Sequence, residues 1–343
     1  MGLKFKDLVV KEEIAISDLK GKVVAIDSMN LLYQFLTTVR SADGSPLTDQ
    51  YGNVTSHLIG LFNRTTSLME QGLKLVFVFD GKAPEIKRRT LEKRTAVKKE
   101  ASLRLKEAEE AGNIEEMRKF ASRTVVLTKE MILSAKKVIE VLGLPIVQAP
   151  SEGEAQTAYM VKKGDAYASI SQDYDNLIFQ CPTLVRNLSI AGRRKMSGRF
   201  AYQTVKPELI SLRKVLDNLK LNLEQLIILA ILVGTDYNPG GVKGIGPKTA
   251  LKLLQEFGTN FETIFKKVDW EKHYPDLSWK DIFNIIKGMP VTDDYVLEWK
   301  SVGTNEVIEL LVEKHGFSED RVRSKLEKLK KEKTQQKGLG SYF

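Results

Sequence analysis

Seven acidic residues stand at predicted strand ends or beside turns, where their side chains can reach a common ligand. They are Asp27, Asp80, Glu152, Glu154, Asp173, Asp175 and Asp236. If these carboxylates converge, they repel one another and raise each other's pKa values unless cations neutralise them. Mg²⁺ and Mn²⁺ prefer such oxygen ligands, and pairs of these ions serve in phosphodiester hydrolysis. The acids therefore predict a metal-dependent hydrolase of phosphate esters, provided that the fold gathers them.

Each acid also has a purely structural alternative, which the sequence leaves open. The alternatives are an N-cap at Asp27, a turn at Asp80–Gly81, a capping box of Ser151 with Glu154, and ordinary loop positions for Asp173 and Asp175. Considered one at a time, most of these acids are better explained by their structural alternatives. Considered together, seven acids at loop junctions of one basic protein are better explained by a metal site.

Three short apolar segments that end in acids predict the elements that position them. The segments 22–27, 74–80 and 166–173 are predicted to be buried parallel strands alternating with helices. The predicted fold class is α/β, with a central, mainly parallel sheet covered by helices on both faces. Ligands of such sheets bind beyond the carboxyl ends of the strands, where Asp27 and Asp80 lie. Asp173 and Asp175, two residues apart in extended chain, point to one side.

Composition narrows the class of protein. The chain has 343 residues, of which 42% are hydrophobic, as in a packed globular protein. The longest apolar run, 226–233, is far shorter than the ~20 residues of a membrane-spanning helix, so we expect no integral membrane protein. The N-terminus lacks the apolar core of a signal peptide. One cysteine cannot form an internal disulfide, and one cysteine with three scattered histidines argues against a Cys/His zinc site.

Positive charge is concentrated in one segment. The net charge is +9, and residues 82–104 hold nine basic against three acidic side chains. We predict charged helices over 82–123, starting near Pro84 and broken at Gly112–Asn113. A solvated helix with internal ion pairs is the alternative, but the basic excess favours a surface that faces phosphates.

A glycine-rich stretch, GVKGIGPKTALKLL, follows the apolar run. It superficially resembles a P-loop, but Pro247 stands where the glycine before Lys248-Thr249 is needed, and the stretch follows an apparent helix. A turn leading into a helix N-terminus instead offers backbone N–H groups to a phosphate.

Five motifs in order resemble the structure-specific flap endonucleases, the 5′-nucleases of DNA replication and repair. The motifs are AIDSMNLLYQF, FVFDGKAPEIKRR, APSEGEAQ, SQDYDNLIF and VGTDYNPGGVKGIGPKTA. The resemblance covers nearly the whole chain. The absence of a long basic extension after the tail is more typical of the archaeal than of the eukaryotic form.

The resemblance implies a PIN-like 5′-nuclease core with added modules. The expected organisation is a nuclease core at 1–260 (N-terminal region 1–99, intermediate region 116–258), a helical arch at about 82–133, a helix-turn-helix at about 223–258, a C-terminal helical wrap at 261–333 and a flexible tail at 334–343. A single-stranded 5′ flap would thread through the arch.

The resemblance also assigns roles to residues. All seven acids match the family's metal ligands for two Mg²⁺ ions, with Mn²⁺ expected to substitute. The implied catalytic residues are Lys87, Arg94, Asp27, Asp80, Glu154, Asp173 and Asp175. The implied DNA contacts are Tyr33, Lys87, Arg94, Glu152, Gly234, Asp236, Gly244, Gly246 and Lys248, with K⁺ expected at the helix-turn-helix. Tyr33 would stack on a nucleotide; its alternative is a core aromatic beside Phe35.

The implied activity is cleavage of 5′ flaps at the single-strand/double-strand junction, with 5′→3′ exonuclease activity, in Okazaki fragment maturation and long-patch base excision repair. The tail resembles a sliding-clamp (PCNA) peptide through Gln336, Leu339, Tyr342 and Phe343. We expect a monomer with no membrane partner, intracellular, and either cytoplasmic and nucleoid-associated (archaeal) or nuclear (eukaryotic). The rival hypotheses are a non-catalytic clamp-associated scaffold, a four-way-junction resolvase and an RNA-directed nuclease.

Overall fold

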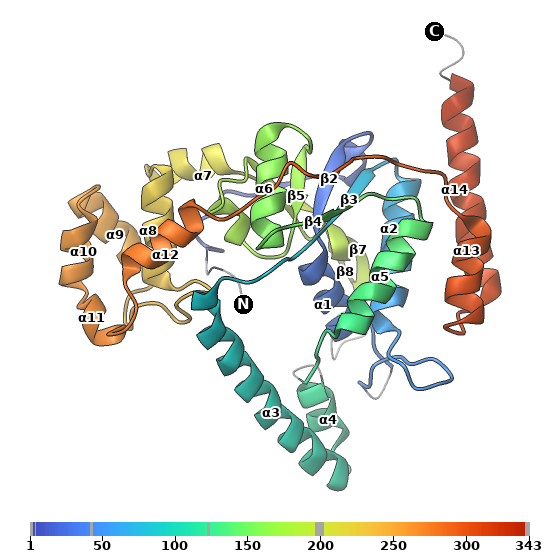
Figure 1. Cartoon of the computed structure of the whole chain (residues 1–343), viewed down its shortest axis with the longest axis horizontal. Coiled ribbons are helices and arrows are strands. Elements are labelled where there is room, and N and C mark those ends of the chain that lie inside the picture. The colour runs from blue at the N-terminus through green and yellow to red at the C-terminus, as the bar shows by residue number, and fades with distance from the viewer. Residues whose placement is uncertain (1–2, 4, 42–43, 122–123, 196–201, 340–343) are drawn as a thin grey trace.

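The computed structural model describes residues 3, 5–41, 44–121, 124–195 and 202–339. Its centre is a seven-stranded sheet in the order β1-β9-β6-β5-β2-β3-β4 (Figure 1). The strands are β1 (Glu12–Glu13), β2 (Val23–Asp27), β3 (Lys74–Phe79), β4 (Ile146–Gln148), β5 (Ala168–Ile170), β6 (Thr183–Arg186) and β9 (Glu208–Ser211). Strands β2 to β6 are parallel, and β9 runs antiparallel to β6 and β1. The predicted mainly parallel α/β sheet is confirmed.

Helices cover both faces of the sheet because neighbouring strand residues point to opposite sides. On one face, Ile26 and Phe77 pack in a core with α1 (Ser28–Thr38), α2 (Ser56–Glu70) and α5 (Lys129–Val141). On the other face, Ala25 and Val76 pack with α6 (Gly153–Lys163). All four of these strand side chains are at most 2% exposed. Because both faces of the strands are buried, their sequences are continuous apolar runs.

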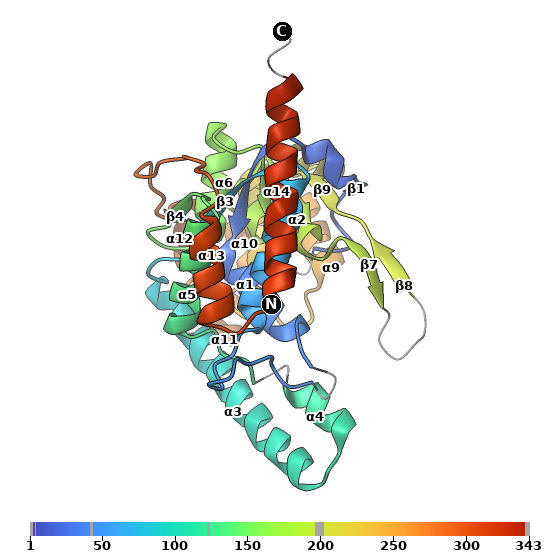
Figure 2. The ribbon, with the colours of Figure 1, turned by 90° about the vertical axis from the view of Figure 1, so that its right-hand side faces the viewer.

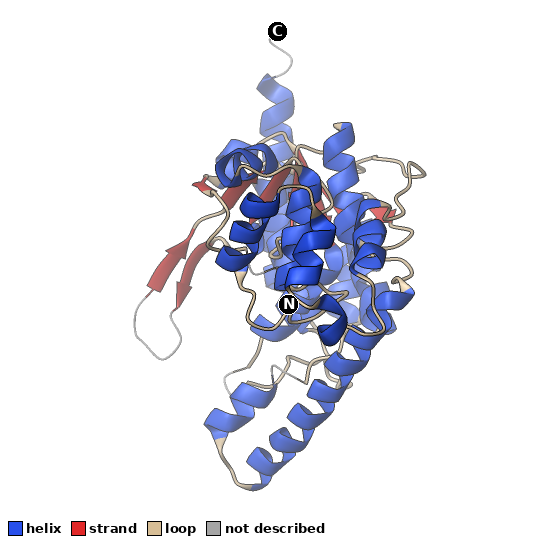
Figure 3. Cartoon of the chain, turned by 90° about the vertical axis from the view of Figure 1, so that its left-hand side faces the viewer, coloured by secondary structure: helices blue, strands red, loops and turns tan. Residues whose placement is uncertain are grey.

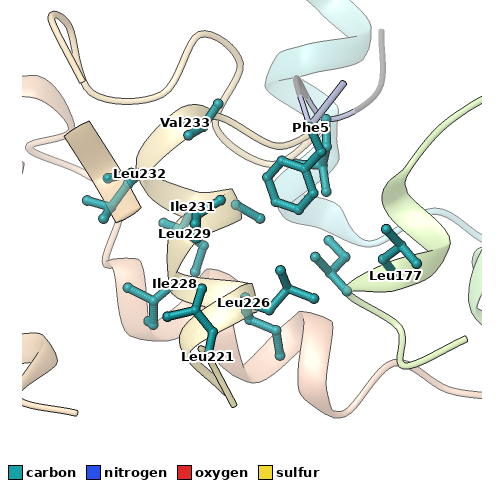
Figure 4. Packing of buried hydrophobic residues seen from close by; sticks show 14 of the residues in the cluster. Phe5, Leu177, Leu221, Leu226, Ile228, Leu229, Ile231, Leu232 and Val233 are labelled. Carbon is teal, nitrogen blue, oxygen red and sulfur yellow. The ribbon is translucent and has the colours of Figure 1, made fainter. Parts of the chain in front are cut away.

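A second core surrounds α8. The helices beside the sheet are α7 (Leu212–Leu219), α8 (Leu223–Val233), α9 (Pro247–Phe257), α10 (Phe261–Lys267), α11 (Trp270–His273) and α12 (Trp279–Lys287). Every residue from Leu226 to Val233 is at most 5% exposed, because a helix that is apolar on all sides must be buried on all sides. Figure 4 shows α8 side chains facing Phe5 and Leu177.

Two helices project from the body at the segment predicted to be basic (Figures 1 and 2). A 3-10 turn (Glu85–Lys87) leads into α3 (Arg88–Glu110), and α4 (Ile114–Ala121) returns. The break falls at the predicted place, since Gly112 has a φ of 64°. The expected end of the arch at residue 133 lies inside α5.

The C-terminal part crosses the α6 face of the sheet before it turns helical. Residues 289–303, here called the strap, lead without helix or strand to α13 (Thr304–Ile308), a π-helical turn (Glu309–Glu313) and α14 (Glu319–Leu339). In α14, Val322 and Leu326 belong to the same core as α2. Residues 334–339, which we predicted as part of a flexible tail, continue α14, and the Gln, Lys and Leu residues among them are good helix formers. Tyr342 and Phe343 lie outside the described residues.

The sequence predicted three strands, and the structure adds β1, β4, β6 and β9 to the central sheet and a separate pair of strands. A two-stranded hairpin of β7 (Gly192–Lys195) and β8 (Tyr202–Val205) stands away from the central sheet (Figure 3). Among the described residues, no helix combines the length and the apolar character that crossing a membrane requires.

Candidate metal centre and nucleic-acid site

Three neighbouring parallel strands deliver acids to one edge of the sheet. Asp27 ends β2, Asp80 follows β3, and Asp173 comes three residues after β5. Strand β2 lies between β3 and β5, where the strand order reverses. Ligands of open α/β sheets bind at such a reversal. The structure thus places these acids at the edge that the sequence predicted.

The N-terminus of α6 brings Glu152 and Glu154 to the same edge. Glu152 is the N-cap residue of α6 and is 7% exposed. The next N–H, of Gly153, donates a 2.8 Å hydrogen bond to Asp80 Oδ1. This approach is close, because a Cβ on Gly153 would lie 2.5 Å from that oxygen.

Polar side chains tie the acids together. Ser171 Oγ lies 3.4 Å from Asp27 Oδ2 and 3.3 Å from Glu154 Oε1, and can donate to either carboxylate. Asn30 Nδ2 donates to Asp173 Oδ2 at 2.8 Å. Acids that are up to 146 positions apart in the sequence therefore share hydrogen-bond partners. Ser171 and Asn30 were missed by the sequence analysis, since neither belongs to a recognisable spacing pattern.

Asp175 is held by the N-terminal segment. Its Oδ1 accepts a 2.8 Å hydrogen bond from the backbone N–H of Leu3, 172 positions away. Asp175 is 9% exposed, and the apolar anchor of the segment, Phe5, is fully buried. The sequence carries no signal for this long-range contact.

The structure confirms one of the structural alternatives for the acids and contradicts another. Asp27 does cap α1, because its Oδ1 accepts from the N–H of Asn30 at 3.1 Å. The capping box is wrong: Ser151 Oγ donates to the carbonyl of Lys82, and Glu154 accepts from Ser171. A carboxylate that caps a helix still has a second oxygen for a ligand, so the N-cap role does not compete with a metal role.

Burial and mutual repulsion raise the pKa values of four of the carboxyl groups. Burial, followed by repulsion from Asp80, raises the pKa of Asp27 to about 8. Burial and Asp173 raise the pKa of Asp175 to about 7. Loss of hydration and repulsion from Glu152 raise the pKa of Asp80 to about 6. Burial, then Asp175 and Asp27, raises the pKa of Glu154 well above its usual range. The acids therefore lie close enough to sense one another.

One basic side chain enters the cluster. Lys87 Nζ lies 2.7 Å from Glu152 Oε2 and 3.3 Å from Asp236 Oδ2. Burial lowers the pKa of Lys87, but the attraction of Glu152 and Asp236 outweighs it, and the net shift is upward. The resemblance implied that Lys87 is a catalytic residue and a DNA contact, and the sequence did not predict these ion pairs.

The donor set fits a hard divalent cation. Every acid offers oxygen, and Glu152 Oε1 is buried without a hydrogen-bond partner. Among the described residues, no three His, Cys, Asp or Glu side chains already surround a single point as a metal site.

Of the predicted DNA contacts, Tyr33 lies on α1, the helix that Asp27 caps. Tyr33 on α1 is 36% exposed, so the alternative of a core aromatic is wrong. Lys98 Nζ lies 5.1 Å from the centre of the Tyr33 ring, and the Tyr33 hydroxyl donates a hydrogen bond to the carbonyl of Val125. Arg94 lies on α3, but its side chain is outside the described ones.

The glycine-rich turn joins α8 to α9 and is not a P-loop, since it follows a helix. Gly234, with a φ of 112°, lets the backbone of Gly241 approach. Gly246 is the N-cap residue of α9, and its side of the turn is exposed together with Gly244 and Lys248. The N-terminus of α9 is therefore open to solvent and to an anion.

Together, the acidic sheet edge and the projecting helices, of which α3 is basic, are typical of the class of phosphodiester-cleaving α/β nucleases. Residues 3–101 match the family model of the XPG N-terminal domain, and residues 143–236 match that of the XPG I-region. The chain is 50% identical over 331 residues to flap endonuclease 1 of Pyrococcus horikoshii, covering 96% of this chain and 94% of that protein. It is 49% identical over 345 residues to flap endonuclease 1 of Pyrococcus furiosus, covering 100% and 99%.

Solved structures agree with the sequence relatives. Flap endonuclease-1 from Methanococcus jannaschii matches with a TM-score of 0.76 and 41% identity, over 98% of this chain and 100% of that one. The catalytic core of Rad2 in complex with DNA substrate shares the fold, with a TM-score of 0.70 and 22% identity over 96% and 100%. The chain belongs to the flap endonuclease family, whose members are divalent-metal-dependent nucleases that hydrolyse DNA phosphodiester bonds.

Proposed function

We propose that this protein cleaves 5′ flaps of branched DNA at the single-strand/double-strand junction, with 5′→3′ exonuclease activity on nicks and gaps. The observation that carries the proposal is the gathering of mutually repelling carboxyl groups beside a basic helical arch. Because its substrate would be DNA, the enzyme would act inside the cell, in DNA replication and repair.

The seven acids would hold two Mg²⁺ ions, with Mn²⁺ as a substitute. When bound, such ions lower the pKa of the attacking water and stabilise the leaving oxygen. The chain's own residues do the rest. Ser171 and Asn30 fix the orientation of Asp27, Glu154 and Asp173. Lys87 and Arg94 would stabilise charge on the scissile phosphate.

DNA would be held by shape and backbone rather than by sequence. Tyr33 would stack on the nucleotide at the cleavage site. The N-terminus of α9 with Gly244, Gly246 and Lys248 would take a phosphate of the duplex, with K⁺ in the same turn. Such contacts suit an enzyme that recognises a branch.

We further propose that the C-terminal peptide binds a sliding clamp. Gln336, Leu339, Tyr342 and Phe343 match the clamp-binding pattern, and the three apolar members would be its anchors. Replacing Tyr342 and Phe343 together by Ala should abolish clamp binding while leaving flap cleavage without the clamp within about twofold of wild type. Retained clamp binding, by surface plasmon resonance, would refute this role.

The main test is single-turnover cleavage of a labelled 5′-flap substrate. We expect Asp173→Ala and Asp175→Ala to lose at least ~10³-fold in rate while flap binding in Ca²⁺ or EDTA survives. Asp281→Ala, a change at an exposed acid of α12, is the matched control and should cut normally. Near-normal cleavage by either site variant, or full wild-type activity in EDTA, would count against the metal role.

Substrate choice is tested separately. Comparison of flap, bubble, four-way-junction and RNA substrates should show the flap to be preferred by at least ~tenfold in kcat/KM. Preference for a junction or for RNA would favour the rival nucleases, and no cleavage at all would favour a scaffold.

A further inference from the structure

The loop that carries Asp173 and Asp175 is tied to the end of strand β6 by one side chain. Arg186 is the last residue of β6, and its Nε donates a 2.9 Å hydrogen bond to the carbonyl of Gln172. Its Nη1 donates a 2.5 Å hydrogen bond to the hydroxyl of Tyr174. Gln172 and Tyr174 are the residues on either side of Asp173. One guanidinium group therefore holds both chain neighbours of a proposed metal ligand.

The guanidinium group is fixed by an aromatic ring and a carboxylate. Its central carbon lies 4.1 Å from the centre of the Tyr174 ring, and Tyr174 is only 5% exposed. Arg186 Nη1 also lies 3.2 Å from Glu208 Oε2, and Glu208 faces Arg186 across the β6–β9 pair. Lys11 Nζ lies 3.7 Å from the same oxygen. Because the ring and the carboxylate orient the planar guanidinium, its donors point in set directions.

Other side chains bond the N–H groups of the same loop. The N–H of Gln172 donates to Asn30 Oδ1 at 3.4 Å, and the N–H of Asp173 donates to Ser171 Oγ at 3.2 Å. Gln172 thus has its N–H bonded to α1 and its carbonyl bonded to β6. Loss of Arg186 would remove the bond at the carbonyl. Rotation of that peptide group would then move the Asp173 carboxylate, because Asp173 follows directly in the chain.

We propose that Arg186 is a positioning residue of the nuclease centre, which fixes the direction of the Asp173 and Asp175 carboxylates by holding Gln172 and Tyr174 together. The inference rests on the proposed metal role of these two acids. Arg186 acts through the backbone that carries the acids and not as a ligand, because a guanidinium group has no lone pair to offer a cation.

The first test measures Mn²⁺ affinity without DNA, by calorimetry. Arg186→Met removes the donors and keeps an unbranched apolar side chain, so we expect Mn²⁺ to bind ~tenfold more weakly, as when other supports of metal ligands are lost. Arg186→Lys keeps the charge but not the planar fork, and should still lose at least ~threefold. Arg213→Met, at a side chain of α7 that is 91% exposed, is the matched control and should change the affinity by less than about twofold.

The outcomes separate this inference from the proposed function. Mn²⁺ binding by Arg186→Met within about twofold of wild type, with clear binding by wild type, would overturn the positioning role alone. No Mn²⁺ binding by any of the four proteins would overturn the metal role of the acids and this inference with it.

Tyr174→Phe removes one oxygen atom and keeps the ring, so it tests the contact even if Arg186→Met fails to fold. We expect Tyr174→Phe alone to bind Mn²⁺ ~threefold more weakly. Added to Arg186→Met, it should cause no further loss, because both changes remove the same contact. Unchanged affinity in Tyr174→Phe, or losses that multiply in the double variant, would overturn the proposal, which needs both partners of the guanidinium group.

The second test separates positioning from a direct contact between Arg186 and DNA. In EDTA, the Kd of duplex DNA for Arg186→Met should stay within about twofold of wild type, with an unchanged slope of log Kd against log salt concentration. At saturating Mn²⁺ and flap DNA, the single-turnover rate should fall by at least ~30-fold, because displacement of a reacting group by ~1 Å costs ~10²-fold. General loosening of the fold would instead weaken DNA binding together with the rate. A slope reduced by ~0.9, with Mn²⁺ affinity unchanged, would assign Arg186 to a phosphate and overturn the positioning role.

Discussion

At the scale of single residues, ionising the buried carboxyl groups of the site costs free energy. Asp27 and Asp175 lie among other acids and away from water, and their pKa values are raised to about 8 and about 7. The folded protein therefore binds protons that the unfolded chain has already released at neutral pH. Stability that depends on those protons is present at low pH and is lost as the pH rises through the folded pKa values.

This predicts how the metal-free protein responds to pH. Between about pH 6.5 and pH 9 in EDTA, the free energy of unfolding should fall by ~2–3 kcal/mol, since one pKa unit corresponds to ~1.4 kcal/mol. Saturating Mg²⁺ should flatten the slope, because bound cations stabilise the charged carboxylates. Urea denaturation at several pH values measures both. A free energy that stays level or increases towards pH 9 in EDTA would contradict the raised pKa values.

A second residue-scale prediction concerns Tyr33. Tyr33→Phe keeps the ring for stacking and loses only the exposed hydrogen bond to Val125, so cleavage should remain within about threefold of wild type. Tyr33→Ala should lower single-turnover cleavage by at least ~tenfold, because base–aromatic stacking contributes ~1–3 kcal/mol. Equal rates for Ala and Phe would exclude a stacking role.

At the scale of elements, the strap holds α6 in place on the sheet. Gln156 of α6 is fully buried and bonds Thr292 of the strap twice: its Nε2 donates to the carbonyl, and its Oε1 accepts from the N–H, each at 2.8 Å. Trp299 fastens the other end through the carbonyl of Leu75. The helix that presents Glu152 and Glu154 is thus fixed by chain that lies beyond residue 288.

Breaking that pair should loosen the fold. Gln156→Ala leaves two backbone groups of Thr292 without their partner, and we expect a loss of ~2–4 kcal/mol in the free energy of unfolding. Gln50→Ala, at an exposed loop position, should cost less than ~0.5 kcal/mol. Chemical denaturation compares them, and similar values for the two variants would show that the strap contact is dispensable.

The sequence predicted those elements whose signals are local. A short stretch of contiguous residues carries the signal for each of these features: the apolar strands β2, β3 and β5, the break at Gly112 and the buried run of α8. Strand β1, only two residues long and acidic, exists through pairing with β9 almost 200 positions away. The ion pairs of Lys87 and the support of Asp175 by Leu3 likewise depend on distant segments meeting. No pattern within one window encodes such contacts, whereas the identity of the seven acids could be predicted from motifs.

At the scale of the whole molecule, a net charge of +9 coexists with an acidic centre. An excess of basic side chains attracts a polyanion such as the DNA backbone, whereas the seven clustered acids gather at the sheet edge. Binding of duplex DNA should therefore weaken steeply with salt, independently of base sequence.

Lys248 offers a quantitative check. Lys248→Ala should weaken duplex binding about equally for all sequences and reduce the slope of log Kd against log salt concentration by ~0.9, the value of one phosphate contact. Lys300→Ala, on the strap, should leave the slope unchanged. Fluorescence anisotropy at several KCl concentrations gives both slopes, and an unaltered slope for Lys248→Ala would exclude a phosphate contact there.

The dispersed origin of the sheet-edge acids has a consequence for biosynthesis. Asp27 leaves the ribosome more than 200 residues before Asp236, and the strap that fixes α6 emerges later still. A partly translated chain can form early strands, since domains begin to fold during synthesis, but it cannot possess a complete nuclease centre. A fragment that ends before residue 236 lacks one of the clustered acids, and one that ends before residue 289 lacks the strap, so the proposed centre is complete only when synthesis of the polypeptide is nearly finished.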